Sequence, residues 1–321
     1  MAIGKHIEEF HGLPVFDFFP EEEPEQDREL PAPGAAAWRV GLDYDAEESF
    51  EERWTAFLDA VECSEVRAVV IGPWWAEDYE PLTEALAAIV RSAGRLPALR
   101  ALFIGDVTYE ECEISWLQMT DVTPVLESFP QLEELVVRGA SGDYDGKSRL
   151  ALRPVRHDHL RALRFEAGGL PGEVVRAVGE CELPALERLE LWLGLDEYGG
   201  DASISDLAPF LAGARFPALR HLGLENSEIQ DQIAEAVSNA PVVAQLERLS
   251  LALGTLTDEG AIALLAGQPL THLKSLDLHH HFLSEELQQR LRDTLGAAGV
   301  DLDLSKQKEP DDDWRYVANG E

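Results

Sequence analysis

The stretch LPALERLEL (183–191) carries leucines at its fourth, seventh and ninth positions, and six further stretches repeat that spacing with apolar residues. These stretches are LPALRALFI (96–104), FPQLEELVV (129–137), HDHLRALRF (157–165), FPALRHLGL (216–224), VAQLERLSL (243–251) and LTHLKSLDL (270–278). Val66, Val69 and Ile71 form an earlier unit, and Val300, Leu302 and Leu304 form a terminal strand. Successive first positions lie 26 to 33 residues apart. Self-similarity that recurs at such intervals is typical of repeat architectures.

The spacing predicts a short strand in every repeat. Alternate residues of a strand point to opposite faces, so the leucines face a core and the residues between them face outward. In four repeats a proline stands two residues before the first leucine, namely Pro97, Pro130, Pro184 and Pro217. Proline there stops a helix and favours an extended chain. One unit cannot bury its apolar face alone, but stacked units share a continuous core.

The segments between the strands carry apolar residues at helical spacing. We expect helices over 81–93, 205–214, 227–240, 257–267 and 284–298, with Thr257 and Ser284 at helix N-termini. The connection over 139–159 lacks this spacing and is expected to cross in extended form. Strand and helix in alternation predict an α/β solenoid, with parallel strands on the concave face and mostly helices on the convex face.

The L-x-x-L-x-L spacing in units of about 27 residues resembles the ribonuclease-inhibitor class of leucine-rich repeats. The unit with Leu246, Leu249 and Leu251, followed by LTDEGA (256–261), is the most similar. The resemblance covers 66–304 and implies a horseshoe-shaped solenoid. The chain departs from the family at the ninth repeat position, where the family has Asn or Cys. Gly254 and His281 occupy that position in the last two units.

Longer segments resemble a narrower family of bacterial, mostly actinobacterial, cytoplasmic leucine-rich-repeat proteins of unknown function. The segments are EISWLQMTDVTPVLESFPQLEELVVRG (113–139), LELWLGLDEYGGD (189–201), NSEIQDQIAEAV (226–237) and LDLHHHFLS (276–284). This resemblance runs nearly from end to end and implies a cytoplasmic location, but it assigns no chemistry. Three widely spaced cysteines and a first segment unlike a signal peptide favour the same location.

The ends of the chain do not repeat. We divide the chain into an N-terminal arm with an acidic Pro/Ala-rich linker (1–37), a strand–helix cap (38–65), the solenoid (66–304) and a C-terminal tail (305–321). The apolar stretch HGLPVFDFFP (11–20) could pin the arm to the body, and 21–37 is expected to be a flexible linker. The tail either docks through Trp314 and Tyr316 or frays.

The chain carries 26 basic and 61 acidic residues, a formal net charge of −35. Phosphate backbones and anionic membrane surfaces repel such a protein, so we expect neither nucleic acid nor membrane as a partner. No nucleophile elbow, phosphate-binding loop or dinucleotide fingerprint is present, and we therefore expect no catalytic residues, no cofactor and no enzyme activity.

The residues between the core leucines define the concave face, which we expect to be the main contact surface for a partner. The candidate contact residues are Phe103, Val136, Arg138, Arg164, Glu166, Arg188, Glu190, Trp192, His221, Glu225, Arg248, Asp277 and His279. Phe103 and Trp192 would be hard to explain on an open sheet without a partner.

Three insertions after predicted strands should lie along one edge of the solenoid and form a second candidate surface. They are 72–80, 105–120 and 194–203, and they are rich in aromatic and acidic residues. The candidates are Trp74, Trp75, Tyr79, Tyr109, Glu110, Trp116, Asp196 and Tyr198. Aromatic rings supply contact area and carboxylates supply charge complementarity. The alternative is that these loops only cover the rim.

His279, His280 and His281 raise the question of a metal site. Consecutive residues of an extended chain point in different directions, so structural polar contacts are the favoured interpretation and no metal is expected. The primary hypothesis is therefore a non-catalytic, monomeric interaction scaffold for a protein or peptide. An acidic inhibitor or accessory subunit of a cationic enzyme, and a histidine-dependent metalloenzyme, are the alternatives.

Overall fold

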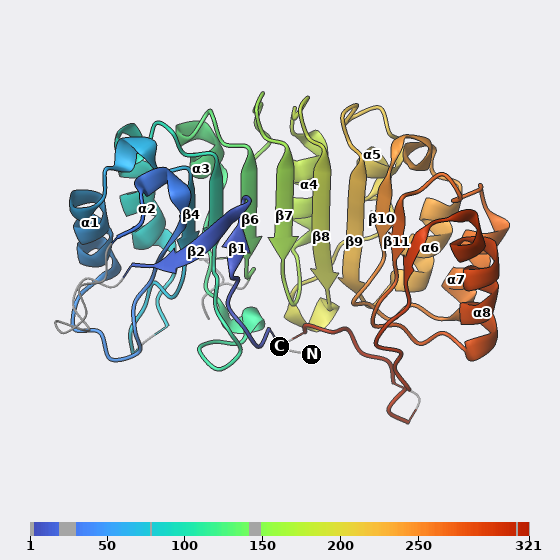
Figure 1. Cartoon of the computed structure of the whole chain (residues 1–321). Helices are drawn as coiled ribbons and strands as arrows, with labels where there is room; N and C mark the ends of the chain where they lie inside the picture. The colour runs from blue at the N-terminus through green and yellow to red at the C-terminus, as the bar shows by residue number, and fades with distance from the viewer. Residues whose placement is uncertain (1–2, 19–29, 78, 141–148, 313, 321) are drawn as a thin grey trace.

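The computed structural model describes residues 3–18, 30–77, 79–140, 149–312 and 314–320. One open sheet of twelve strands runs through it, in the order of the chain, and every neighbouring pair is parallel except the first (Figure 1). The strands are β1 (Glu9–Phe10), β2 (Leu13–Asp17), β3 (Ala37–Val40), β4 (Ala68–Ile71), β5 (Ala101–Ile104), β6 (Glu134–Arg138), β7 (Ala162–Glu166), β8 (Arg188–Gly194), β9 (His221–Ser227), β10 (Arg248–Ser250), β11 (Ser275–Asp277) and β12 (Asp301–Asp303).

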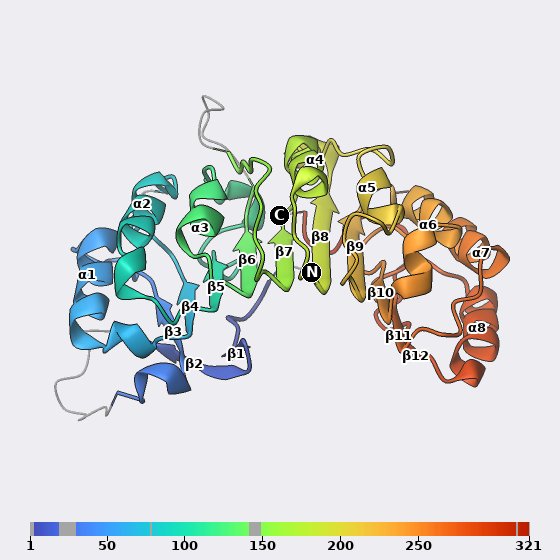
Figure 2. The ribbon, with the colours of Figure 1, turned by 90° about the horizontal axis from the view of Figure 1, so that it is seen from above.

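The helices lie on one face of this sheet, the outer face of the arc seen in Figure 2. They are α1 (Phe50–Ala60), α2 (Thr83–Arg91), α3 (Thr123–Ser128), α4 (Gly172–Glu180), α5 (Ala208–Leu211), α6 (Gln230–Ser238), α7 (Asp258–Ala266) and α8 (Glu285–Thr294). The opposite face of the sheet is called the concave face below. This arrangement fits the predicted α/β solenoid.

The core forms where the repeat leucines meet in register. One row across eight strands consists of Leu102, Leu135, Leu163, Leu189, Leu222, Leu249, Leu276 and Leu302. Its first seven members are buried, and each buried leucine stabilises the fold by roughly 1.5–3 kcal/mol. The leucine spacing therefore determines the strand register, and with it the positions of the side chains on the concave face.

The predicted helices are present with shorter bounds. Ser284 and Thr257 cap α8 and α7, since their side chains accept hydrogen bonds from backbone N–H groups of the first turn. The helix expected from residue 227 begins three residues later, because β9 continues through Ser227. Helices α3 and α4 were not predicted; α4 contains Gly172 and Gly179, and glycine disfavours helix. The described part of 139–159 contains no helix, and 141–148 lies outside the described residues.

The N-terminal arm contributes strands to the sheet. Residues 3–18, called the hairpin segment below, form β1 and β2, and β2 pairs in parallel with β3. The expected linker is partly structured, because Pro33–Ala35 forms a 3₁₀ turn whose Pro33 carbonyl accepts a hydrogen bond from the Trp38 indole. Residues 19–29 of that linker lie outside the described residues.

Candidate partner-binding face

Register places the concave-face side chains of β5–β12 in rows that cross the strands. The first row is Ala101, Glu134, Ala162, Arg188, His221, Arg248, Ser275 and Asp301. The second row is Phe103, Val136, Arg164, Glu190, Gly223, Ser250, Asp277 and Asp303. Two residues further along the strands stand Arg138, Glu166, Trp192 and Glu225. Every predicted concave-face candidate except His279 belongs to these rows, and His279 follows Asp277 by two residues.

The chain itself covers one half of this face. Phe10 of the hairpin segment packs edge-on against Phe103 with 5.7 Å between ring centroids, and both side chains are buried. Val136 belongs to the same apolar cluster, and His11 Nδ1 lies 2.9 Å from Glu134 Oε2. The expectation that Phe103 needs a partner molecule is therefore wrong: its partner is the hairpin segment. The concave face of β3–β6 is called the covered half below.

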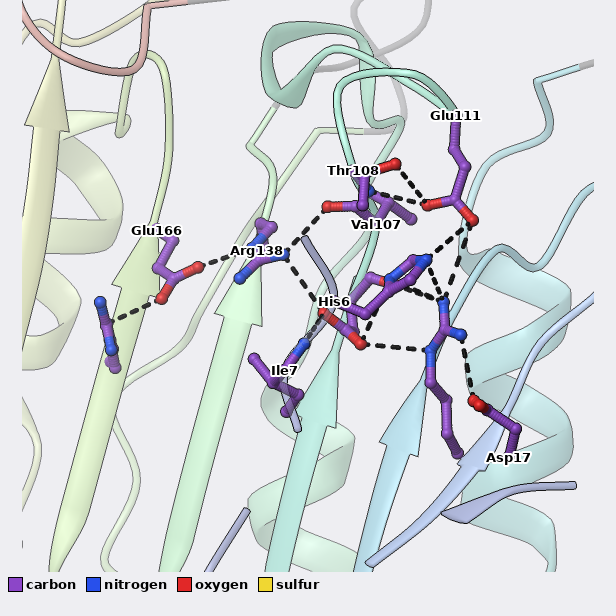
Figure 3. A network of polar contacts seen from close by, with 11 residues as sticks. His6, Ile7, Asp17, Val107, Thr108, Glu111, Arg138 and Glu166 are labelled. Carbon is purple, nitrogen blue, oxygen red and sulfur yellow. Dashed lines mark hydrogen bonds and ion pairs between the residues drawn. The ribbon is translucent and has the colours of Figure 1, made fainter. Parts of the chain in front are cut away.

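A charged network fixes the hairpin segment to the carboxyl ends of these strands (Figure 3). Asp106, which is fully buried, accepts a hydrogen bond from the Ile7 N–H and pairs with Arg39 Nε at 3.1 Å and Arg138 Nη1 at 3.4 Å. Arg138 Nε also donates to Glu166 Oε2 at 2.6 Å. Arg138 and Glu166 are thus internal ion partners, and neither is available at the surface. Removing the partners of a buried carboxylate such as Asp106 would be costly, because the charge would stay buried without compensation.

His6 joins the network through two carboxylates. Its Nδ1 lies 3.5 Å from Asp106 Oδ2 and its Nε2 lies 3.3 Å from Glu111 Oε1. These contacts, first with Asp106 and then with Glu111, raise the pKa of His6 to about 9. Arg39 Nη2 lies 2.8 Å from Nδ1 and opposes the imidazolium charge, but two carboxylates outweigh one guanidinium. The charged ring thus ties the hairpin segment to the loop that follows β5.

Trp192 is buried as well, with 6% of its surface exposed. Its indole N–H donates to Glu225 Oε2 at 2.8 Å, and the Arg164 guanidinium lies 5.3 Å from its ring centroid. The expectation that Trp192 stands free on an open sheet is wrong, because neighbouring charged side chains cover both its ring and its N–H. Burial, and then the charge of Glu190, raise the pKa of Glu225.

Glycine at position 223 makes room for this carboxyl group. A Cβ on Gly223 would lie 3.0 Å from Glu190 Cγ and 3.1 Å from Glu225 Oε1, so the two side chains occupy the space above β9. Glu190 pairs with His221 at 3.1 Å and with Arg164 at 3.1 Å. Burial alone would raise its pKa, but the hydrogen bond from His221 and the charge of Arg164 lower it to about 2.

The concave face of β7–β12 is called the open half below. A cavity of about 390 Å³ lies over it and is lined by residues that include Arg164, His221, Arg248, Asp277 and His279. A smaller cavity of about 200 Å³ lies between the hairpin segment and β6–β8, and Arg188 lines it. The open half therefore combines a hollow with charged and polar side chains that a partner could contact.

The three consecutive histidines bind three different partners. His281, fully buried, accepts a hydrogen bond from the Leu283 N–H and donates from Nε2 to the Leu304 carbonyl. His280 Nε2 donates to the Tyr316 carbonyl at 3.0 Å, and burial lowers its pKa to about 4. His279 Nδ1 lies 2.8 Å from Asp277 Oδ1. These contacts match the structural interpretation of the sequence.

One group of side chains could still hold a metal ion. Asp277, His279 and Asp303 offer ligand atoms that all lie within 4.8 Å of one another. Asp303 is exposed, and His279 and Asp277 already bind each other. Carboxylates in such solvent contact occur commonly without an ion, and nothing else at this position indicates one.

Some aromatic residues of the inserted loops are buried against the solenoid, and others are exposed to solvent. Trp74 and Trp75 are buried, which contradicts their assignment as contact residues; Trp74 donates its indole N–H to the Glu80 carbonyl. Tyr79 and Trp116 are 44% and 57% exposed, and their ring centroids lie 6.4 Å apart, so the first two loops do meet. The remaining candidates divide by exposure: Tyr109, Glu110 and Asp196 are exposed, and Tyr198 is half-buried.

The C-terminal tail docks and does not fray within its described residues. The Tyr316 ring lies 5.7 Å from His280 and 5.6 Å from Phe282, whereas Trp314 is 64% exposed. The chain then returns along the carboxyl ends of the strands (Figure 1), where the Asn226 side chain exchanges two hydrogen bonds with the backbone of Asn319. The tail therefore borders the open half at one edge and leaves its floor uncovered.

Comparison with solved structures finds proteins to which this chain is similar. A structural-genomics protein from Bacteroides fragilis aligns with 28% identity and a TM-score of 0.79, over 88% of this chain and 77% of that one. An internalin from Listeria monocytogenes aligns over 85% of this chain and 75% of its own at 14% identity, but its TM-score of 0.34 is too low to support an argument. No protein-family model and no curated protein matches this chain. None of the described helices has the length and apolar character of a membrane span.

Sequence reasoning missed the two features that shape this face. The hairpin segment was expected to touch the body, but nothing in its composition indicated the concave face as the docking position. His6 and His11 were not singled out, although histidines beside apolar residues in an acidic protein could have pointed to carboxylate partners. Gly223 was also missed. Its place between inward-facing leucines was the available signal.

Proposed function

We propose that this protein is a non-catalytic interaction scaffold and that its partner, a protein or peptide, binds the open half. The observation that carries the proposal is the division of the concave face. The hairpin segment closes β3–β6 with buried aromatic rings and a charged network, whereas β7–β12 keeps a polar hollow of about 390 Å³. Repeat solenoids present extended concave surfaces of this kind to partners.

The exposed part of the rim supplements this surface. Tyr79, Tyr109 and Trp116 are exposed aromatic residues, and exposed rings of this size are enriched at interfaces. They lie in the loops after β4 and β5, next to the covered half. We therefore assign the open half as the primary contact surface and the rim as a secondary one.

Site-specific photo-crosslinking tests the proposal. A benzoylphenylalanine at Ser275, on the open half, is compared with one at Gln289, which is exposed on α8 of the outer face. In an extract of the source cells, position 275 should yield an adduct of one defined mass that position 289 does not yield. Identification of the adduct by mass spectrometry then names the partner. Equal adducts from both positions, or none from position 275, would refute the proposal.

A further inference from the structure

The chain as a whole is strongly acidic, but on β7–β10 of the open half the basic side chains are more exposed than the acidic ones. On β7–β9 the carboxylates lie at the floor: the Glu166 and Glu190 side chains are 3% and 12% exposed, and Glu225 is buried. The bases reach solvent: Arg188 and Arg248 are exposed, and the Arg164 side chain is 36% exposed. A molecule that approaches this part of the face meets guanidinium groups first, despite the net charge of −35.

Register aligns the basic side chains into a stripe. Arg188, His221 and Arg248 are direct neighbours on β8, β9 and β10. Neighbouring strands lie about 5 Å apart, so the stripe is about 10 Å long. We call it the basic stripe. Its length suits one or two carboxylate groups, because a carboxylate fits the fork of a single arginine.

The carboxylates near the stripe already have partners. Glu166 binds Arg138 and Arg164, and Glu190 binds Arg164 and His221. Burial, followed by the neighbouring Glu190, raises the pKa of Glu225 and favours its neutral form. The floor carboxylates thus offset part of the charge of the stripe, chiefly through Glu190 and His221, but they leave the Arg188 and Arg248 guanidinium groups without a close ion pair.

The two arginines of the stripe have acidic neighbours, Glu190 near Arg188 and Glu247 near Arg248, but form no close ion pair among the described residues. No ion pair within 4 Å involves Arg188 or Arg248 there, and the Arg248 guanidinium has only a long contact of 3.5 Å with Ser275 Oγ. Elsewhere in the chain, arginines with surface exposure commonly pair with acids, as Arg156 does with Asp158 and Glu182. The stripe therefore has the spare donors that an anionic ligand needs.

The stripe ends at both sides. In the row of the stripe, Ser275 follows Arg248 on β11 and Asp301 follows on β12, while Asp277 and Asp303 occupy the second row of the same two strands. Asp301 and Asp303 are exposed. On the other side, Glu134 of β6 is held by His11. An acidic group is thus attracted to β8–β10 and repelled from β11–β12. This limits a bound segment to a single position across the strands.

We infer that the basic stripe receives carboxylate side chains from an acidic segment of the partner protein. The inference rests on the proposed function and specifies the chemistry of the partner. Nucleic acid is disfavoured, because binding to a polyphosphate typically uses about 6–10 phosphate contacts and the stripe offers two arginines. A basic partner segment, which the net charge alone would favour, meets guanidinium groups at this position.

Calorimetric titration with defined peptides tests the inference. The probe is acetylated, amidated deca-glutamate, and the variants are R188Q/R248Q on the stripe and R290Q/R292Q on α8. Both changes remove two positive charges from exposed arginines, so the second is a control for net charge. Deca-glutamate should bind wild type and R290Q/R292Q equally, and R188Q/R248Q about tenfold more weakly.

Several results would overturn the inference. They are absence of deca-glutamate binding, equal binding to all three proteins, or equally tight binding of deca-thymidylate. Photo-crosslinking of the native partner from position 275 separates this failure from that of the proposed function. If R188Q/R248Q leaves the adduct yield unchanged, the acidic-segment inference fails and the scaffold remains. If the chain that carries the crosslinker at position 275 and no other change gives no adduct, the scaffold proposal itself fails.

Discussion

Replacing Phe10 by Ala should release the hairpin segment from the concave face. Phe10 is 6% exposed and packs edge-on against Phe103, which is 4% exposed, at 5.7 Å between ring centroids. Removal of a buried phenyl ring costs about 3–5 kcal/mol in a protein core. Because the hairpin segment borders solvent and can detach by itself, the lower end, about 3 kcal/mol, is the appropriate magnitude.

Hydrogen exchange followed by mass spectrometry measures this release. A loss of about 3 kcal/mol corresponds to an increase of about a hundredfold in opening. The amides of Val15 and Phe18, which donate to the Glu8 and Arg39 carbonyls, should exchange faster by about that factor. Exchange in β8–β10 should not change. Tyr44→Ala is the matched control, because Tyr44 is 77% exposed and its removal should leave exchange in residues 13–18 unaltered.

The reasoning fails if Phe10→Ala accelerates those amides less than about fivefold, or if β8–β10 opens together with them. The first result would mean that the charged network alone holds the hairpin segment. The second would mean that the hairpin segment is an inseparable part of the solenoid core. In either case the covered half would not be a separately attached cover.

Three further predictions concern titration and a buried polar contact. The pKa of His6, followed by NMR, should be about 9. The charged His6 ring then contributes its full stabilisation below its ordinary pKa of 6.5, and this contribution is lost as pH rises through 9. A measured pKa below 6.5 would show that the ring binds as a neutral acceptor. His280 has a pKa lowered to about 4 while the tail covers it, so docking of the C-terminal tail should weaken as pH falls from 6.5 towards 4, because His280 binds the proton more tightly once the tail has detached. Protection of the amides in 314–320 that stays constant over this range, after correction for the intrinsic pH dependence of exchange, would contradict it. Trp192→Phe should lower the free energy of unfolding by about 1–3 kcal/mol, since the buried Glu225 loses its indole donor, whereas Trp116→Phe at an exposed site should change it by less than about 0.5 kcal/mol in the same urea titration.

The order of the strands and the faces of their side chains could be predicted from the sequence. The leucine spacing is local and repeats, so Leu189 and Leu222 determine where Glu190 and Gly223 lie before any tertiary contact is known. Helix ends were predicted less well, because Ser227 is compatible with both a strand end and a helix start.

The cover over β3–β6 could not be predicted in the same way. It depends on contacts between residues far apart in the chain, such as His11 with Glu134, separated by 123 positions, and these belong to no repeat. The expected exposure of Phe103 and Trp192 failed for a related reason. A period of two assigns a side chain to a face, but it does not show what another segment places above that face.

Side-chain footprinting by hydroxyl radicals, with and without the crosslink-identified partner, tests the central claim most directly. The account predicts that His221 and His279 of the open half become protected in the complex, while Phe10 and Phe103 stay equally unreactive in both states. Protection on the outer helices without protection of His221 and His279, or new reactivity of Phe103 in the complex, would contradict the claim that the partner binds the open half beside an occupied covered half.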